Sequence, residues 1–249
     1  MSVAANPLPA SVRLAWWGTA WLRGHVVADH LMDAVLDEDA AHLLAFEGSG
    51  TEPLLTGLGR LRTSGADAFG AALPAEGDPV GLGGPAAFNA AALEAGEAVV
   101  ALDAAGFALH GLVPTRVGAA VTWSVTAAER RQVPDVGEAD RGLRAALPEA
   151  ADALAALDVA RWRPEVADRL LNLRHRPRAA APPGVPRRCV ELAERARQAL
   201  EIVDLALEDD GGALSAAEVD GRRVALSSLG RAARRALVAA ASPEVWPPE

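Results

Sequence analysis

Apolar side chains at the start of the chain recur at the intervals of a helical face. Between residues 12 and 22, Trp17 and Trp21 lie four positions apart on one such face, and Gly24 then ends the pattern. A second helical face follows between residues 27 and 36. The pattern therefore predicts two helices that form a helical hairpin at the N-terminus.

From residue 42 to about residue 128 the pattern changes to short apolar runs separated by glycine and proline, which is typical of β-strands. Apolar and polar residues alternate between 121 and 126, as in a strand with one buried face. The connection from Asp103 to Gly106 predicts a hairpin, so we expect a largely antiparallel sheet. One helix is expected inside this region, at 85–95. The predicted strands are 42–47, 53–61, 68–73, 98–103, 107–114 and 119–126.

After Pro134 the periodicity is helical to the end of the chain. Pro148 and Gly230 mark positions where two of these helices could bend or split. A stretch rich in alanine and proline, 176–186, predicts a linker or extended loop. The predicted helices are 138–157, 164–173, 187–207 and 215–241.

These elements together predict an α+β fold, with an N-terminal helical hairpin plus a largely antiparallel sheet, followed by a C-terminal helical bundle. A chain of 249 residues with 51% hydrophobic side chains is long and apolar enough for one or two domains. We place an α+β sheet-containing domain at residues 1–130 and a helical domain at 135–249.

Composition excludes several kinds of chemistry. The chain contains 24 positively charged side chains, all of them arginine, and no tyrosine. Without lysine there is no Schiff base and no phosphate-loop lysine. The single cysteine, Cys189, excludes an intrachain disulfide and any zinc site that needs several cysteines. The apolar runs are well below the roughly 20 residues of a membrane-spanning helix, so we expect a soluble, cytoplasmic protein with no membrane partner. We also expect no cofactor.

Charge is distributed unevenly along the chain. The net charge of −9 argues against general nucleic-acid binding, but residues 159–188 carry eight arginines against two acidic residues. The basic segment 161–188 could bind a phosphate-containing ligand through Arg174 and Arg176. Docking of this segment on the acidic N-terminal part, within the chain or across a homodimer, is favoured because the charges are complementary.

A glycine-rich motif is the main candidate for a ligand site. Gly81, Gly83 and Gly84 fit the G-x-G-x-x-A form of a dinucleotide-binding loop, and Asp103 follows at a suitable spacing for a ribose-binding acid. However, residues 74–79 before the motif are rich in turn formers, whereas this site requires a buried strand there. The alternative interpretation is an ordinary glycine-rich loop.

Two further groups of residues were weighed as sites. Acidic and histidine side chains recur every four residues from His25 to Asp37, but they extend over more than two helical turns, so we assign no metal site. Trp17 and Trp21 are expected to enter the core, whereas Trp16 points elsewhere and, with Trp17, could anchor a partner subunit, although core packing is the favoured interpretation for all three.

No constellation of catalytic side chains can be assigned from the sequence, so the catalytic residues are unknown. The first hypothesis is therefore a non-catalytic interaction or regulatory protein, either as a homodimer or with another protein partner. The alternative is a small-molecule-binding protein or enzyme that uses the glycine-rich loop at 81–86 and nearby acidic loop residues.

Overall fold

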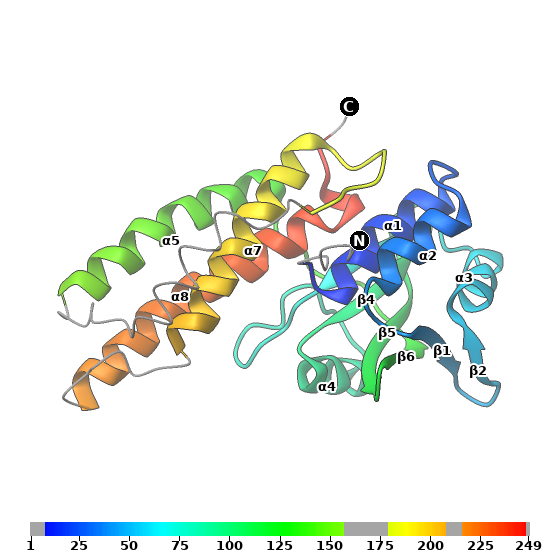
Figure 1. Cartoon of the computed structure of the whole chain (residues 1–249), viewed down its shortest axis with the longest axis horizontal. Helices are drawn as coiled ribbons and strands as arrows, with labels where there is room; N and C mark the ends of the chain where they lie inside the picture. Colours follow the sequence, from blue (N-terminus) through cyan, green and yellow to red (C-terminus); the bar gives the residue numbers. More distant parts are fainter. Residues whose placement is uncertain (1–7, 157–178, 208–215, 248–249) are drawn as a thin grey trace.

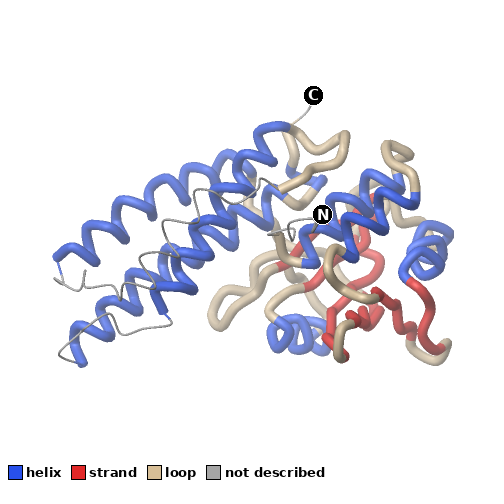
Figure 2. Tube along the Cα trace, viewed as in Figure 1, coloured by secondary structure: helices blue, strands red, loops and turns tan. Residues whose placement is uncertain are grey.

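A computed structural model describes residues 8–156, 179–207 and 216–247, and these have the predicted α+β architecture. The strands gather at one end of the molecule, and long helices extend away from them (Figure 2). The helices are α1 (Ala10–Leu22), α2 (Ala28–Leu36), α3 (Leu54–Thr63), α4 (Ala86–Ala95), α5 (Val136–Ala156), α7 (Arg187–Leu207) and α8 (Ala216–Ala240), followed by the short 3-10 helix η2 (Pro243–Val245). The strands are β1 (Ala41–Phe46), β2 (Gly50–Pro53), β3 (Ala68–Ala72), β4 (Ala98–Leu102), β5 (Ala108–Val117) and β6 (Ala120–Ala127).

The strands form one mixed sheet in the order β2-β1-β6-β5-β4-β3. Strands β3 to β6 follow one another as an antiparallel meander, and β1 and β2 form a hairpin. Among the described strands, only the pairing of β1 with β6 is parallel. The prediction of a largely antiparallel sheet behind a helical hairpin is therefore confirmed.

The predicted strand at 53–61 is wrong, because this segment forms helix α3. The short apolar run with glycine and proline suggested a strand, but Gly57 lets a helix lie directly on β1: a Cβ atom at Gly57 would come within 2.7 Å of the Leu44 side chain. Strand β2, just before α3, was not predicted.

The other predicted elements can be compared with the structure one by one. Helix α7 has the predicted bounds, and the strands β1, β3, β4, β5 and β6 lie within a few residues of theirs. Helix α8 runs without a break through Gly230, and α5 includes Pro148. The predicted helix at 164–173 lies outside the described residues.

One face of the sheet, which we call the inner face, is covered by helices. Helix α1 packs on β3 and β4, and α2 packs on α1. The contact is close, because a Cβ atom at Gly18 would come within 2.7 Å of the Phe69 ring. Phe69, Leu44 and Trp123 point from the sheet into this core and are fully buried.

The opposite face, the outer face, is covered only in part. Helix α4 lies on the other side of the strands from α1 and α2 (Figure 1). It packs on β5, where the Phe88 ring fills the space that a side chain at Gly111 would need. Phe88 and Ala92 form a second, smaller core with the outer-face residues of β3, β4 and β5, such as Val100. The outer face of β6 and β1 lies beyond this core.

Strand β3 is an edge strand, yet its outward backbone groups are paired. The Phe69 N–H donates to Thr19 Oγ1 at 2.9 Å, and the Thr19 hydroxyl donates to the Phe69 carbonyl at 3.2 Å. The Ala71 N–H donates to the Ala241 carbonyl at 3.0 Å, and Arg131 Nη1 donates to the Ala71 carbonyl at 2.9 Å. This edge is therefore closed to strand pairing with another chain.

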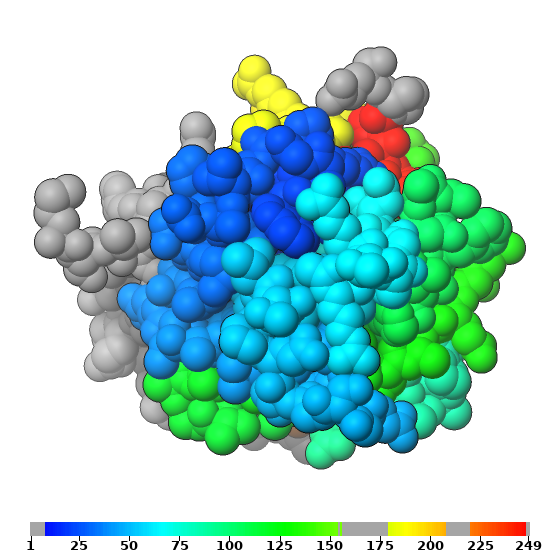
Figure 3. Space-filling model, turned by 90° about the vertical axis from the view of Figure 1, so that its right-hand side faces the viewer, coloured from blue at the N-terminus to red at the C-terminus, as the bar shows by residue number. Residues whose placement is uncertain are grey.

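Helices α5, α7 and α8 form a layer that we call the helical arm. Helix α8 packs on both α5 and α7, and its C-terminal end enters the N-terminal core. The arm points away from the sheet (Figure 1), and the opposite end of the molecule is made almost entirely by the blue, cyan and green residues of the N-terminal part (Figure 3). Among the described residues, no helix has the length and apolar character needed to cross a membrane.

Candidate functional site

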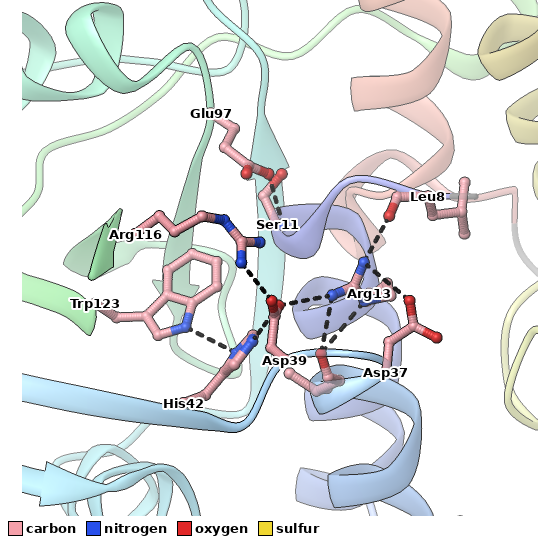
Figure 4. A network of polar contacts seen from close by, with 10 residues as sticks. Leu8, Ser11, Arg13, Asp37, Asp39, His42, Glu97, Arg116 and Trp123 are labelled. Atoms are coloured by element: carbon pink, nitrogen blue, oxygen red, sulfur yellow. Dashed lines mark hydrogen bonds and ion pairs between the residues drawn. The ribbon is translucent and has the colours of Figure 1, made fainter. Parts of the chain in front are cut away.

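A network of polar contacts joins the segment after α2 to β1, β5 and β6 (Figure 4). Asp39 lies at its centre. The carboxylate atom Oδ1 accepts a hydrogen bond from Arg116 Nη1 at 2.6 Å, and Oδ2 lies 3.0 Å from His42 Nε2. Arg13 Nη2 is 3.6 Å from the same Oδ2. Two arginines and one histidine therefore share a single carboxylate.

The contacts of His42 determine which ring nitrogen carries the proton. Trp123 Nε1 can only donate a hydrogen bond, and it lies 3.2 Å from His42 Nδ1, which must therefore accept. In the neutral ring the proton is then on Nε2, which donates to Asp39. The His42 side chain is fully buried, so both of its nitrogens are used inside the protein.

The network also shifts the ionisation of its members. Burial lowers the pKa of His42, and the hydrogen bond with Asp39 only partly opposes this shift. Burial alone would raise the pKa of Asp39, but hydrogen bonds from His42 and Arg116 outweigh it and hold that pKa below its ordinary value. The stable state is a neutral histidine beside an ionised carboxylate.

Arg13 extends the network to the two N-terminal helices. Its Nη1 donates to the Leu8 carbonyl at 2.9 Å, and its Nη2 donates to the Val35 carbonyl at 3.1 Å. At the start of α1, Glu97 Oε2 accepts a hydrogen bond from the Ser11 N–H at 2.9 Å, which is a favourable place for a negative charge. These contacts fix the helical hairpin to the sheet and leave His42 without a free nitrogen for a substrate.

The glycines of the predicted ligand loop lie between β3 and α4. A Cβ atom at Gly81 would come within 2.7 Å of Ala72, and one at Gly83 would clash with the Arg130 carbonyl oxygen. Gly84 has a φ of 114°, and its N–H donates to Asn89 Oδ1 at 3.0 Å. Glycine at 81 and 83 thus permits the loop to pack against neighbouring backbone.

Asp103 lies apart from this loop. Its Oδ1 accepts hydrogen bonds from the N–H groups of Ala105 at 2.9 Å and Phe107 at 2.8 Å, within the turn between β4 and β5. Ala72, which Gly81 contacts, pairs with the first residue of β4, whereas Asp103 follows the last. The structure therefore places the glycines and the acid at opposite ends of β4.

Core packing, the favoured interpretation for the tryptophans of α1, holds for Trp16. Its ring is fully buried, and its Nε1 donates to the Ala240 carbonyl at 3.1 Å. It therefore cannot anchor a partner subunit. Trp17 and Trp21 are half-buried at the border of the core. The other two predicted interaction residues, Arg174 and Arg176, lie outside the described residues.

The described histidine, cysteine and acidic side chains do not gather in groups of three or more that could hold a metal ion. Cys189 is buried in α7, and burial raises the pKa of its thiol to about 11. A thiol in this state is neither a nucleophile nor a ready metal ligand at neutral pH.

The part of the outer face that α4 leaves uncovered has an unusual composition. Thr122 pairs with Leu43 of β1 on one side and with Thr115 of β5 on the other, so these side chains share the face. Ser124 and Thr126 of β6 continue the same row and are exposed. None of these five side chains is charged. The alternation at 121–126 already indicated a polar strand face, but no site was assigned to it from the sequence.

A groove of about 370 Å³ runs between this surface and α4. Its walls are mainly apolar, and Glu94 is the charged residue among them. The lining residues are Ala87, Phe88, Ala91, Glu94 and Ala95 of α4, Val113, Pro114 and Thr115 of β5, and Ser124 and Thr126 of β6. We call this groove and the row of hydroxyl side chains beside it the outer-face surface.

Comparison with known proteins identifies two matching family models. The model described as Rv1486c-like protein, N-terminal domain, matches residues 11–138. The model described as Rv1486c-like protein, C-terminal domain, matches residues 137–238. Neither description names an activity, a ligand or a partner. No curated protein and no solved structure matches the chain.

Proposed function

The chain belongs to the Rv1486c-like protein family, and we propose that it is a non-catalytic interaction protein that holds a protein partner on its outer-face surface. The observation that carries this proposal is the uncharged, partly apolar half of the sheet beside α4. Antiparallel sheets that lack a covering layer ordinarily turn polar and charged residues to water. A sheet half that stays uncharged on a chain of net charge −9 is suited to burial against another protein.

The chemistry of the outer-face surface indicates the kind of partner. The centres of protein interfaces are depleted of charged residues. Thr115, Thr122, Ser124 and Thr126 can each donate and accept a hydrogen bond, and half-buried Leu43 beside Thr122 supplies apolar area. The partner we propose is a protein with an uncharged, mainly apolar surface and a few hydrogen-bonding groups that meet these hydroxyls.

The state of the reactive side chains supports the non-catalytic part of the proposal. Both ring nitrogens of His42 are occupied within the protein, and the Cys189 thiol is buried with a raised pKa. Acid–base and nucleophilic catalysis need such groups to be within reach of a substrate.

The first experiment is site-specific photo-crosslinking. A photoreactive amino acid is placed at Ser124, in the outer-face surface, or at Thr56, an exposed residue of α3 that lies away from it. Expressed in the native host, the chain labelled at Ser124 should capture a defined protein, which mass spectrometry identifies and which then binds again when purified. The Thr56 position is the matched control. Equal capture at both positions, or a purified protein that does not bind, would refute the proposal.

A further inference from the structure

The helical arm carries a second groove, on a different part of the molecule from the outer-face surface. Helices α5 and α8 form its walls, and it has a volume of about 300 Å³. Small residues make its floor, so no large side chain rises from it toward the rims. These small residues are Ala139, Gly142, Ala145 and Ala146 of α5, and Ser228 and Ala232 of α8.

The two rims of this groove carry opposite charges. Glu138 and Glu149 lie on the α5 rim, and Arg231 and Arg235 lie on the α8 rim. Arg235 also binds the buried carboxylate of Asp78 at 2.9 Å. Glu138, Glu149 and Arg231 are exposed and make no ion pair within the part of the chain that the structure describes. The groove therefore presents an acidic rim, a small-residue floor and a basic rim.

We propose that this groove is the contact between two copies of the chain in a homodimer. If two copies meet groove to groove about a two-fold axis parallel to the helices, each acidic rim faces the basic rim of the other copy. A two-fold axis across the helices would instead place like charges together, so the charges select one orientation. Because the floor side chains are small, none of them projects beyond the rims to hold the two copies apart.

The pattern of charge argues for a second copy over other occupants. A nucleic acid would be repelled by Glu138 and Glu149, and an acidic or basic peptide would be repelled by one of the two rims. An occupant that fits this groove carries both positive and negative charges, separated by the width of the groove. The same groove on a second chain has this arrangement by symmetry.

Charge reversal tests the proposal by sedimentation velocity on the purified full-length chain. We expect the native chain to be a dimer. The variant Glu138→Arg with Glu149→Arg has two basic rims, and Arg231→Glu gives two acidic rims, so each alone should dissociate at least about tenfold more readily. An equimolar mixture of the two variants should form a heterodimer, because every rim then faces the opposite charge. A substitution that only damages folding would not be rescued by mixing.

Filling the groove is a second test that does not depend on charge. A Cβ atom at Gly142 meets nothing within 4 Å, so Gly142→Gln leaves the fold of the monomer intact while it occupies the floor. We expect this variant to be a monomer. Its melting temperature should be no lower than that of the native chain at a concentration where the native dimer has dissociated. Gly59→Gln in α3 is the matched control, because Gly59 also lies in a helix with open space around it, and this variant should remain dimeric.

Three outcomes would overturn the dimer: a native chain that is monomeric at about 100 µM, a mixture of the charge variants that stays monomeric, or a Gly142→Gln variant that remains dimeric. The outcome is independent of the proposed partner on the outer-face surface, because Ser124→Arg should leave the dimer unchanged. A monomer that still captures a partner at Ser124 would reject the dimer and retain the interaction function.

Discussion

At the scale of single residues, the burial of His42 makes the free energy of unfolding depend on pH. Its pKa is lowered in the folded chain, chiefly by burial, so the unfolded chain binds more protons below the ordinary histidine pKa. The free energy of unfolding should therefore fall as pH decreases from about 7 through the range below 6.5. Asp39 has a lowered pKa as well, and its contribution is lost at still lower pH.

This gives a prediction about the slope of stability with pH. His42→Gln should make the melting temperature less sensitive to pH between 7.5 and 5.5, because the buried group that must be protonated is gone. Part of the sensitivity should remain, since burial also lowers the pKa of His110. Exposed His30 provides the control, and His30→Gln should keep the native slope. A slope unchanged by His42→Gln would contradict the assignment of a neutral, buried ring.

Cys189 allows a second prediction at this scale. The thiol is buried in α7 and has a pKa of about 11, so at pH 7.5 it is both inaccessible and protonated. A thiol reagent should not modify the folded chain over minutes and should modify one group per chain in guanidinium chloride. Rapid modification of the folded chain would show that α7 opens far more often than its packing indicates.

The tryptophans of α1 mark the limit of prediction from the sequence for single residues. The four-residue spacing of Trp17 and Trp21 suggested that this face was the buried one. Most of α1 is in fact buried, because the sheet, α2 and the end of α8 surround it. Periodicity identifies a buried face only when another face meets water, so it could not place Trp16. The pairing of His42 with Trp123 joins residues 81 positions apart, which no local pattern reveals.

At the scale of secondary-structure elements, the protected edge of β3 depends on few side chains. Thr19 alone serves both outward backbone groups of Phe69. Thr19→Val should leave a buried N–H unpaired and lower the free energy of unfolding by roughly 1–3 kcal/mol, measured by urea denaturation. Thr56→Val, at an exposed position of α3, should change it by less than about 0.5 kcal/mol. Equal effects would mean that water replaces the hydroxyl at this edge.

The sequence predicted well those elements that are buried on one face and open on the other, because their apolar and polar residues then recur at regular intervals. β6 alternates because one face is buried and the other is open, and α7 has an apolar stripe against α8. Helix α3 was mistaken for a strand because its short apolar run is interrupted by glycine. Gly57 in fact permits close packing on β1, and the sequence does not show whether a glycine makes a turn or a close contact. The predicted ligand loop illustrates the same ambiguity at Gly81 and Gly83.

At the scale of the whole molecule, the sheet and the helical arm share one hydrophobic core. This core extends from α1 and the inner face of the sheet to α7 and α8 without interruption. Trp16 contacts the end of α8, and Arg131 joins Ser242 and Glu244 to β3. The sequence indicated a change of character near residue 134 but gave no sign that α8 returns to the N-terminal part, because that contact joins residues 224 positions apart.

A shared core predicts cooperative unfolding. Tryptophan fluorescence reports mainly on the N-terminal part, where α1 and β6 hold four of the six tryptophans, and circular dichroism at 222 nm is dominated by the long helices of the arm. The two signals should change together in a single urea transition. Two separate midpoints would show that the arm and the sheet unfold independently, against the continuity of the core.

The central claim is that the outer-face surface holds a protein partner, and the most direct measurement is the dissociation constant of the captured partner, determined by calorimetry with purified components. Ser124→Arg places a charge in the middle of this surface, so the account predicts a dissociation constant at least about tenfold larger than that of the native chain. Thr56→Arg, on exposed α3, should leave it unchanged. A Ser124→Arg variant that binds with native affinity would contradict the account.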